Sequence, residues 1–192
     1  MVDAVALRDR PLEAAALVDD AAWAAARCYA AAPHTAVEET SRRRWLITGT
    51  PYEGLNGVYW ARHGDGIHEA LEPFRQVEVP MLWHAGPTSP DTLPGELVAA
   101  GLRHYGEEPG MLLDLDQPTR RWSPPEGLEI RRVGTHAQLA AWARIWAGPA
   151  SPLLLDRLVA LRAPAAYGVG ARTPHLLGVL DGEPVACGAV WV

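Results

Sequence analysis

The C-terminal segment constrains the fold most strongly, because it reads as a complete β-hairpin. Two apolar stretches, HLLGVL at 175–180 and EPVACGAVWV at 183–192, are separated by Asp181 and Gly182. An Asp-Gly pair tolerates the positive φ angles that a two-residue hairpin turn needs. Because an isolated hairpin is only marginally stable in water, these strands need further elements that pair with them or cover them. The sequence therefore predicts a sheet with a covering layer.

The residues before the hairpin predict those further elements. LEIRRV at 128–133 alternates between apolar and polar residues, as a half-buried strand does. Thr135 is a favourable N-cap for a helix at 136–147, and a second helix is expected at 152–162. Strand, helix, helix and hairpin therefore follow one another in this part of the chain.

A polar, proline-rich stretch separates this part from the rest. The sequence DQPTRRWSPPEG at 116–127 has the composition of a linker. We therefore divide the chain into a first domain at 1–115, a linker at 116–127 and a second domain at 128–192.

The first domain alternates between strand-like and helix-like segments. The strand at 57–61 starts after the turn residues Gly54 and Asn56, and Pro80 precedes a short buried strand. Such alternation favours a mixed or parallel α/β sheet with flanking helices, so the fold class is α/β (α+β). The expected segments are helices at 12–32, 66–77 and 93–100, strands at 45–48, 57–61 and 81–84, and extended segments at 102–105 and 110–115.

Composition excludes several classes of function. All 17 basic residues are arginine, so no lysine is present to form a Schiff base or act as a general base. The formal net charge is -6 and the arginines are scattered, which argues against a nucleic-acid partner. No apolar run is long enough for a membrane helix, and the first residues lack a signal-peptide pattern. With only Cys28 and Cys187, we expect reduced thiols and a cytoplasmic protein without a membrane partner.

Several of these segments resemble the GNAT superfamily of N-acetyltransferases. "LEIRRV" looks like the family's first strand, and "LLGVLDGEPVACGA" is similar to its second and third strands. "VPMLWHAGP" followed by "LPGELVAAGLRHYGEEPGMLLDL" looks like the fifth strand, fourth helix and closing strands of a degenerate copy. The chain thus resembles a tandem GNAT protein of the actinobacterial type, similar in architecture to mycothiol synthase. The resemblance implies a second repeat that stops before its acetyl-CoA motif.

The same resemblance implies acetyl-CoA as cofactor and a small-molecule amine as acceptor. The family's pyrophosphate loop has the pattern Q/R-x-x-G-x-G/A, and here the corresponding stretch is ARHGDGIHEA. Gly64 and Gly66 match its glycines and are the candidate cofactor-binding residues. Ala61 replaces the basic or amide residue, and Asp65 and Glu69 add negative charge, so a plain surface turn is the alternative. The family's general-acid tyrosine is not carried over, since Leu97 occupies that position.

Candidate catalytic and substrate-binding residues lie near predicted strand ends. His84 ends the strand at 81–84, where ligands of open α/β sheets bind, and a purely structural histidine is the alternative. Glu38 and Glu39 precede the first predicted strand and are candidates to receive a proton from an amine. Trp60 and Trp83 are candidate substrate contacts. We expect no metal site, because His63, His68, His84 and His104 lack a metal-ligand spacing.

These observations support two hypotheses of different classes. The first is an acetyl-CoA-dependent N-acetyltransferase, with acyl transfer to the amine of a small molecule. The alternative is a non-catalytic GNAT-like binding or dimerisation module without a functional acetyl-CoA site. Its partner would be a second copy of the chain, paired through the apolar edge strand at 183–192.

Overall fold

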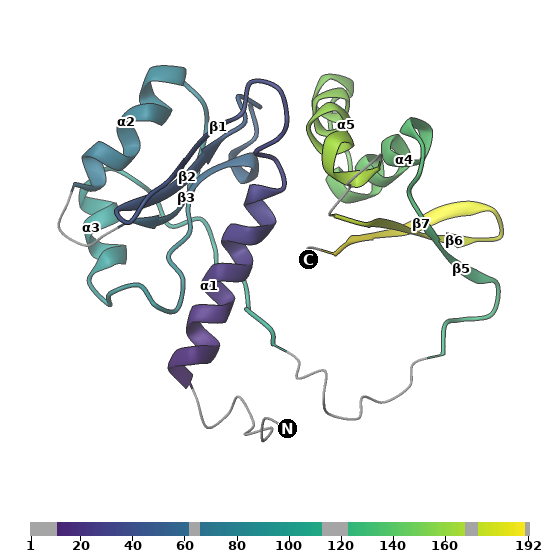
Figure 1. Cartoon of the computed structure of the whole chain (residues 1–192), viewed down its shortest axis with the longest axis horizontal. Coiled ribbons are helices and arrows are strands. Elements are labelled where there is room, and N and C mark those ends of the chain that lie inside the picture. The colour runs from purple at the N-terminus through teal and green to yellow at the C-terminus, as the bar shows by residue number, and fades with distance from the viewer. Residues whose placement is uncertain (1–10, 62–65, 113–122, 168–172, 191–192) are drawn as a thin grey trace.

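The computed structural model describes residues 11–61, 66–112, 123–167 and 173–190, and contains two separate sheets (Figure 1). The first sheet has four strands and the second has three. This mixed arrangement confirms the predicted α/β (α+β) class. The elements of the first part are α1 (Pro11–Arg27), β1 (Ala36–Glu39), β2 (Arg43–Ile47), the short 3-10 helix η2 (Glu53–Leu55), β3 (Asn56–Ala61), α2 (Ile67–Val77), β4 (Leu82–Trp83) and α3 (Leu93–Ala99).

The first sheet has the order β1-β2-β3-β4 and mixes two kinds of pairing. β1 and β3 both lie antiparallel to β2, whereas β4 lies parallel to β3. Parallel neighbours need a crossover, and α2 provides it. Ala70 and Phe74 of α2 pack on Ile47 and Val58, in a small buried cluster on one face of the sheet. This crossover places the start of α2 beyond the end of β3.

The second sheet contains the predicted hairpin. Its order is β5-β6-β7, and all neighbours are antiparallel. Asp181 and Gly182 have φ angles of 51° and 87°, as the turn between two strands requires. Thr135 and Gln138 form a reciprocal capping box at the start of the first helix of this part. The elements are β5 (Leu128–Arg132), α4 (His136–Ala147), α5 (Pro152–Ala166), β6 (His175–Leu180) and β7 (Glu183–Ala189).

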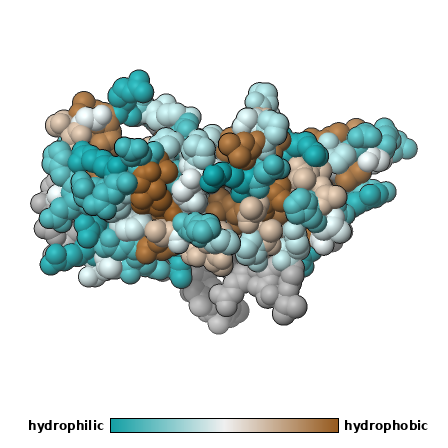
Figure 2. All heavy atoms as spheres, turned by 90° about the horizontal axis from the view of Figure 1, so that it is seen from above, coloured by the Kyte–Doolittle hydropathy of each residue, from teal (hydrophilic) through white to brown (hydrophobic). Residues whose placement is uncertain are grey.

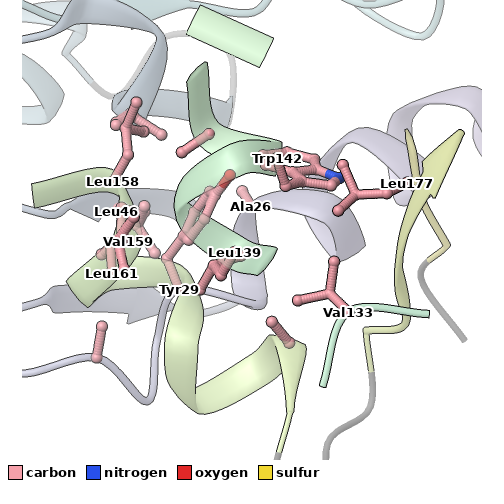
Figure 3. Close-up of a cluster of buried hydrophobic side chains, with 14 of the residues drawn as sticks. Ala26, Tyr29, Leu46, Val133, Leu139, Trp142, Leu158, Val159, Leu161 and Leu177 are labelled. Atoms are coloured by element: carbon pink, nitrogen blue, oxygen red, sulfur yellow. The ribbon is translucent and has the colours of Figure 1, made fainter. Parts of the chain in front are cut away.

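One hydrophobic core joins the two parts of the chain (Figure 3). Ala26 and Tyr29, at the end of α1 and just after it, belong to the same buried cluster as Leu139 and Trp142 of α4. Leu46 of β2 is also part of this cluster. The segments expected as two domains therefore bury apolar surface against each other.

Some sequence-based expectations differ from the structure. The helix predicted at 12–32 ends at Arg27, and the second helix of the second part continues to Ala166. No strand occurs at 102–105 or 110–112, and 113–115 fall outside the described residues. In that region Tyr105 and Met111 are 74% and 88% exposed, so their apolar character does not reflect burial in a sheet.

The surface is mixed in polarity. On the face seen in Figure 2, hydrophobic residues form separate patches among hydrophilic ones. Within the described ranges, no helix combines the length and apolar character that crossing a membrane requires.

Candidate functional site

A pocket of about 540 Å³ opens where the parallel strands β3 and β4 stop pairing. The ladder joins Gly57 to Leu82 and Val58 to Trp83, and the N–H of His84 adds one more bond to the carbonyl oxygen of Val58 at 2.9 Å. β3 continues to Ala61 without a further partner in β4. The pocket is lined by Trp60 and Ala61 of β3, by Trp83 and His84, by Thr88–Pro90, by Leu93, Glu96, Ala99 and Ala100 on or next to α3, by Gly66–Glu69, and by Arg42 and Arg43.

The start of α2 forms one wall of the pocket. Its N-cap is Gly66, which has a left-handed φ of 87° and has no side chain to cap the helix. Glu69 folds back toward it, because a Cβ on Gly66 would lie 3.1 Å from Cγ of Glu69. Arg43 lies 3.6 Å from the Glu69 carboxylate through one terminal nitrogen, while its Nε donates to Glu38 at 3.1 Å. The negative charge expected here from Glu69 is therefore partly offset by Arg43.

Arg42 adds a second positive charge at the pocket. Its backbone N–H donates to the hydroxyl oxygen of Thr40 at 3.2 Å. Within the described ranges, its guanidinium group has no carboxylate partner within 4.0 Å. The arginine run, which the sequence places before a strand, thus supplies two cationic side chains to this pocket.

His84 lines the pocket, and its Nε2 atom is buried beside Gly57 of β3. The imidazole stacks on Tyr59, with ring centroids 4.4 Å apart and an interplanar angle of 11°. Its Nε2 atom is buried and has no hydrogen-bond partner among the described residues. Burial lowers the pKa of His84 below its usual 6.5, although the negative charge of Glu108 acts in the opposite direction. Burial therefore favours the neutral ring.

The loop after His84 is held from the outside by α1. The Asp19 carboxylate accepts a hydrogen bond from the Thr88 N–H at 3.1 Å, and a second one from the Thr88 hydroxyl. Gly86 lies directly against Asp19, since a Cβ there would overlap with Oδ1 of Asp19. Asp19 therefore fixes the position of a loop that lines the pocket, although it does not line the pocket itself.

Asn56, the first residue of β3, forms hydrogen bonds that hold β3 and the segment leading into β4 in place. Its buried amide oxygen accepts from the Thr48 N–H at 2.9 Å, and its amide nitrogen donates to the carbonyl oxygens of Thr50, Tyr52 and Pro80 at 2.8, 3.1 and 2.9 Å. The bond to Pro80 holds the chain that leads into β4. The sequence marks Asn56 only as a turn residue, and its role in joining three segments follows from long-range contacts.

The structure brings together only some of the predicted site residues. Trp60, Trp83, His84 and Gly66 line the same pocket, whereas Gly64 falls outside the described residues. The other two candidates, the glutamates of β1, do not line it.

Glu38 and Glu39 instead hold indole and guanidinium groups. Glu38 accepts from Nε1 of Trp45 at 2.6 Å and from Nε of Arg43 at 3.1 Å. Glu39 accepts from Nε1 of Trp23 at 2.8 Å and lies 3.4 Å from Nε of Arg27. Both carboxylates thereby tie β1 to neighbouring elements. In the described part of the chain, no group of three or more His, Cys, Asp or Glu residues could hold a metal ion.

Comparisons of the chain with protein-family models, with curated proteins and with solved structures each found no match.

Proposed function

We propose that this chain is an acetyl-CoA-dependent N-acetyltransferase that transfers an acyl group to the amine of a small molecule. One observation carries the proposal: a parallel strand pair separates after two paired positions, and a pocket opens at the separation beside the start of a helix. Ligands of open α/β sheets bind at such strand ends. The sequence resemblance to the GNAT superfamily assigns the same strands and the same helix to its cofactor site. A cytoplasmic location is part of the proposal, supported by Cys28 and Cys187, neither of which forms a disulfide within the described part of the chain.

The residues at the pocket fit the two ends of the cofactor to different degrees. The apolar walls contributed by Trp60, Trp83 and Ala61 suit an extended pantetheine arm between the strand ends. Arg42 and the N-terminus of α2 suit the phosphates. The negative charge of Glu69 would repel the phosphates, so we expect acetyl-CoA to bind with a dissociation constant in the micromolar range or weaker.

His84 is the residue proposed to move the proton. When bound, acetyl-CoA would supply an acyl thioester. The acceptor nitrogen would bond to the acyl carbon and lose a proton, the C–S bond would break, and CoA would leave as a thiolate that takes up a proton. The neutral ring of His84 lines the pocket and would take that proton on Nε2, which must first become accessible because it is buried in the unliganded chain. Trp60 and Trp83 would exclude water from the same space.

Isothermal titration calorimetry with acetyl-CoA tests the proposal. Arg42→Ala should weaken binding about two- to fivefold, as expected for an exposed charge pair. Arg103→Ala removes the same charge from an exposed site outside the pocket and should leave binding unchanged. S-acetyl pantetheine, which has no phosphates, should bind without sensitivity to Arg42→Ala.

A catalytic assay separates binding from chemistry. His84→Gln should reduce acyl transfer to a panel of small amines by about 10²-fold or more while acetyl-CoA still binds. Absence of any binding heat at millimolar acetyl-CoA would disprove the proposed function of this pocket.

A second candidate function is self-association through β7. This strand pairs only with β6 among the described strands, and its side chain Val185 is 51% exposed. An open apolar edge favours pairing with another chain, here a second copy. Light scattering should then detect dimers that Val185→Lys disrupts. Ile130→Lys, which adds the same charge to an exposed position on β5, is the control. A monomer at high concentration would refute this candidate.

A further inference from the structure

Arg162 of α5 is a buried cation enclosed by aromatic rings. Only 2% of the residue is exposed. Its guanidinium carbon lies 4.4 Å from the ring centroid of Trp142, 4.9 Å from that of Trp146 and 5.1 Å from that of Tyr29. Among the described residues, no carboxylate lies within 4.0 Å of it, and its Nε has no hydrogen-bond partner. Because a buried charge is costly without compensation, its few remaining polar contacts are important.

The main polar partner of Arg162 is His175 of β6, which is completely buried. One terminal nitrogen of Arg162 lies 3.3 Å from Nε2 of His175, and Nδ1 of His175 lies 2.8 Å from the carbonyl oxygen of Thr173. A carbonyl oxygen only accepts and a guanidinium group only donates. The proton of the neutral imidazole must therefore be on Nδ1, and Nε2 accepts from Arg162.

This pair lies where the two parts of the chain meet. Tyr29, which follows α1 and contacts Arg162, belongs to the first part, as does Tyr52, whose ring lies 6.0 Å from that of Trp146. Trp142 contacts both members of the pair, with its ring centroid 4.7 Å from that of His175. The ring contacts around Arg162 therefore link α4, α5 and the end of α1.

We propose that Arg162 and His175 form an acid-sensitive joint, which holds the two parts of the chain together while His175 is neutral and loosens when it is protonated. A second proton on His175 would replace the acceptor at Nε2 with a donor and place two cations 3.3 Å apart. No described carboxylate is close enough to Arg162 to offset that repulsion.

The other titratable groups around the pair do not supply a compensating charge. Burial raises the pKa of Tyr29 strongly, and the positive charge of Arg162 opposes this only in part. Burial also raises the pKa of Cys187 on β7, again against the effect of Arg162. Both groups therefore stay neutral as the pH falls. Cys28 lies next to Tyr29, and α4 contributes only the uncharged indoles.

The direction of the pH effect follows from the shift of His175. Burial lowers its pKa most, the hydrogen bond to Thr173 raises it by less, and the positive charge of Arg162 lowers it by a still smaller amount. The unfolded chain binds this proton near pH 6.5, but the folded chain does so only at lower pH. Stability is therefore fully present above about pH 6.5 and decreases as the pH falls below it. The loss is about tenfold in the unfolding equilibrium per pH unit, until His175 is protonated in the folded state.

Urea unfolding of the full chain between pH 7.5 and 5.0 tests this joint. His175→Gln keeps an acceptor for Arg162 but cannot be protonated. For each pH unit below about 6.5, the unfolding equilibrium constant of this variant should therefore rise about tenfold less than that of the wild type. His104→Gln, at an exposed position, should leave the wild-type sensitivity intact. Small-angle scattering at pH 5.5 should show a larger radius of gyration for the wild type than for His175→Gln.

A second variant keeps the test decisive if His175→Gln does not fold. Arg162→Met removes the neighbouring cation, so protonation of His175 should become easier and the acid sensitivity should decrease. If the wild type and both variants lose stability in parallel, or if the wild type unfolds without first expanding, the joint is refuted.

Discussion

Replacing Asn56 with alanine should be among the most destabilising single changes in the first part of the chain. Among the described residues, the N–H of Thr48 and the carbonyl oxygen of Pro80 have no hydrogen-bond partner other than Asn56, so both lose their partner. The carbonyl oxygens of Thr50 and Tyr52 keep other donors, the N–H groups of Tyr52 and Leu55. The Thr48 N–H is buried, so leaving it without a partner costs about 1–3 kcal/mol. Pro80 is exposed, so water can replace the donor that its carbonyl oxygen loses, and this second loss adds little.

The measurement is urea denaturation followed by tryptophan fluorescence at pH 7.5. Asn56→Asp keeps an acceptor for the Thr48 N–H but directs a carboxylate oxygen toward three carbonyl oxygens, so it should cost at least as much as alanine. Gln76→Ala is the control, because this amide is exposed and bonds only Glu72, at 3.2 Å. It should change stability by less than about 0.5 kcal/mol. A loss below about 1 kcal/mol for Asn56→Ala would refute the reasoning.

Three further predictions concern two glycines and one helix cap. Gly57→Ala should destabilise the chain by about 1–3 kcal/mol, because the new Cβ would lie 2.8 Å from the carbonyl oxygen of Leu82 and push β3 and β4 apart. Gly95→Ala in α3, where a Cβ meets nothing within 4 Å, should instead stabilise by up to about 1 kcal/mol; equal effects in thermal denaturation would contradict both statements. Thr135→Ala should cost about 1 kcal/mol in the same assay, since the capping box with Gln138 is lost, and an unchanged melting temperature would argue against it.

Local signals in the sequence predicted the second part well. The Asp181-Gly182 turn, the Thr135 cap and the alternation in 128–133 each act over a few residues, and the structure confirms the elements they predict. The strand predicted at 102–105 is wrong because apolar residues alone do not create a partner strand. β1 was not predicted, because Val37 is its only large apolar residue and the sequence shows no strand pattern there. The strand is held to β2 by contacts such as the one between Glu38 and the indole of Trp45.

The candidate site was predictable only in part. Trp60, Trp83 and His84 follow from strand ends that the sequence reveals, and they do line one pocket. The contributions of Arg42 and Asp19 depend on how β2 and α1 pack against distant segments. The same holds for the contact of Arg162 with Tyr29, which links residues far apart in the chain.

The core shared by the two parts has a consequence for how the chain can be divided. A cut in the polar segment at 116–127 would expose Tyr29 and Ala26 on one fragment and Trp142 and Leu139 on the other. Two apolar surfaces that share one buried cluster in the intact chain should recognise each other when the fragments are expressed as separate polypeptides. Such fragments should reassemble in trans, and acid should weaken their affinity in the same range in which it weakens the intact chain.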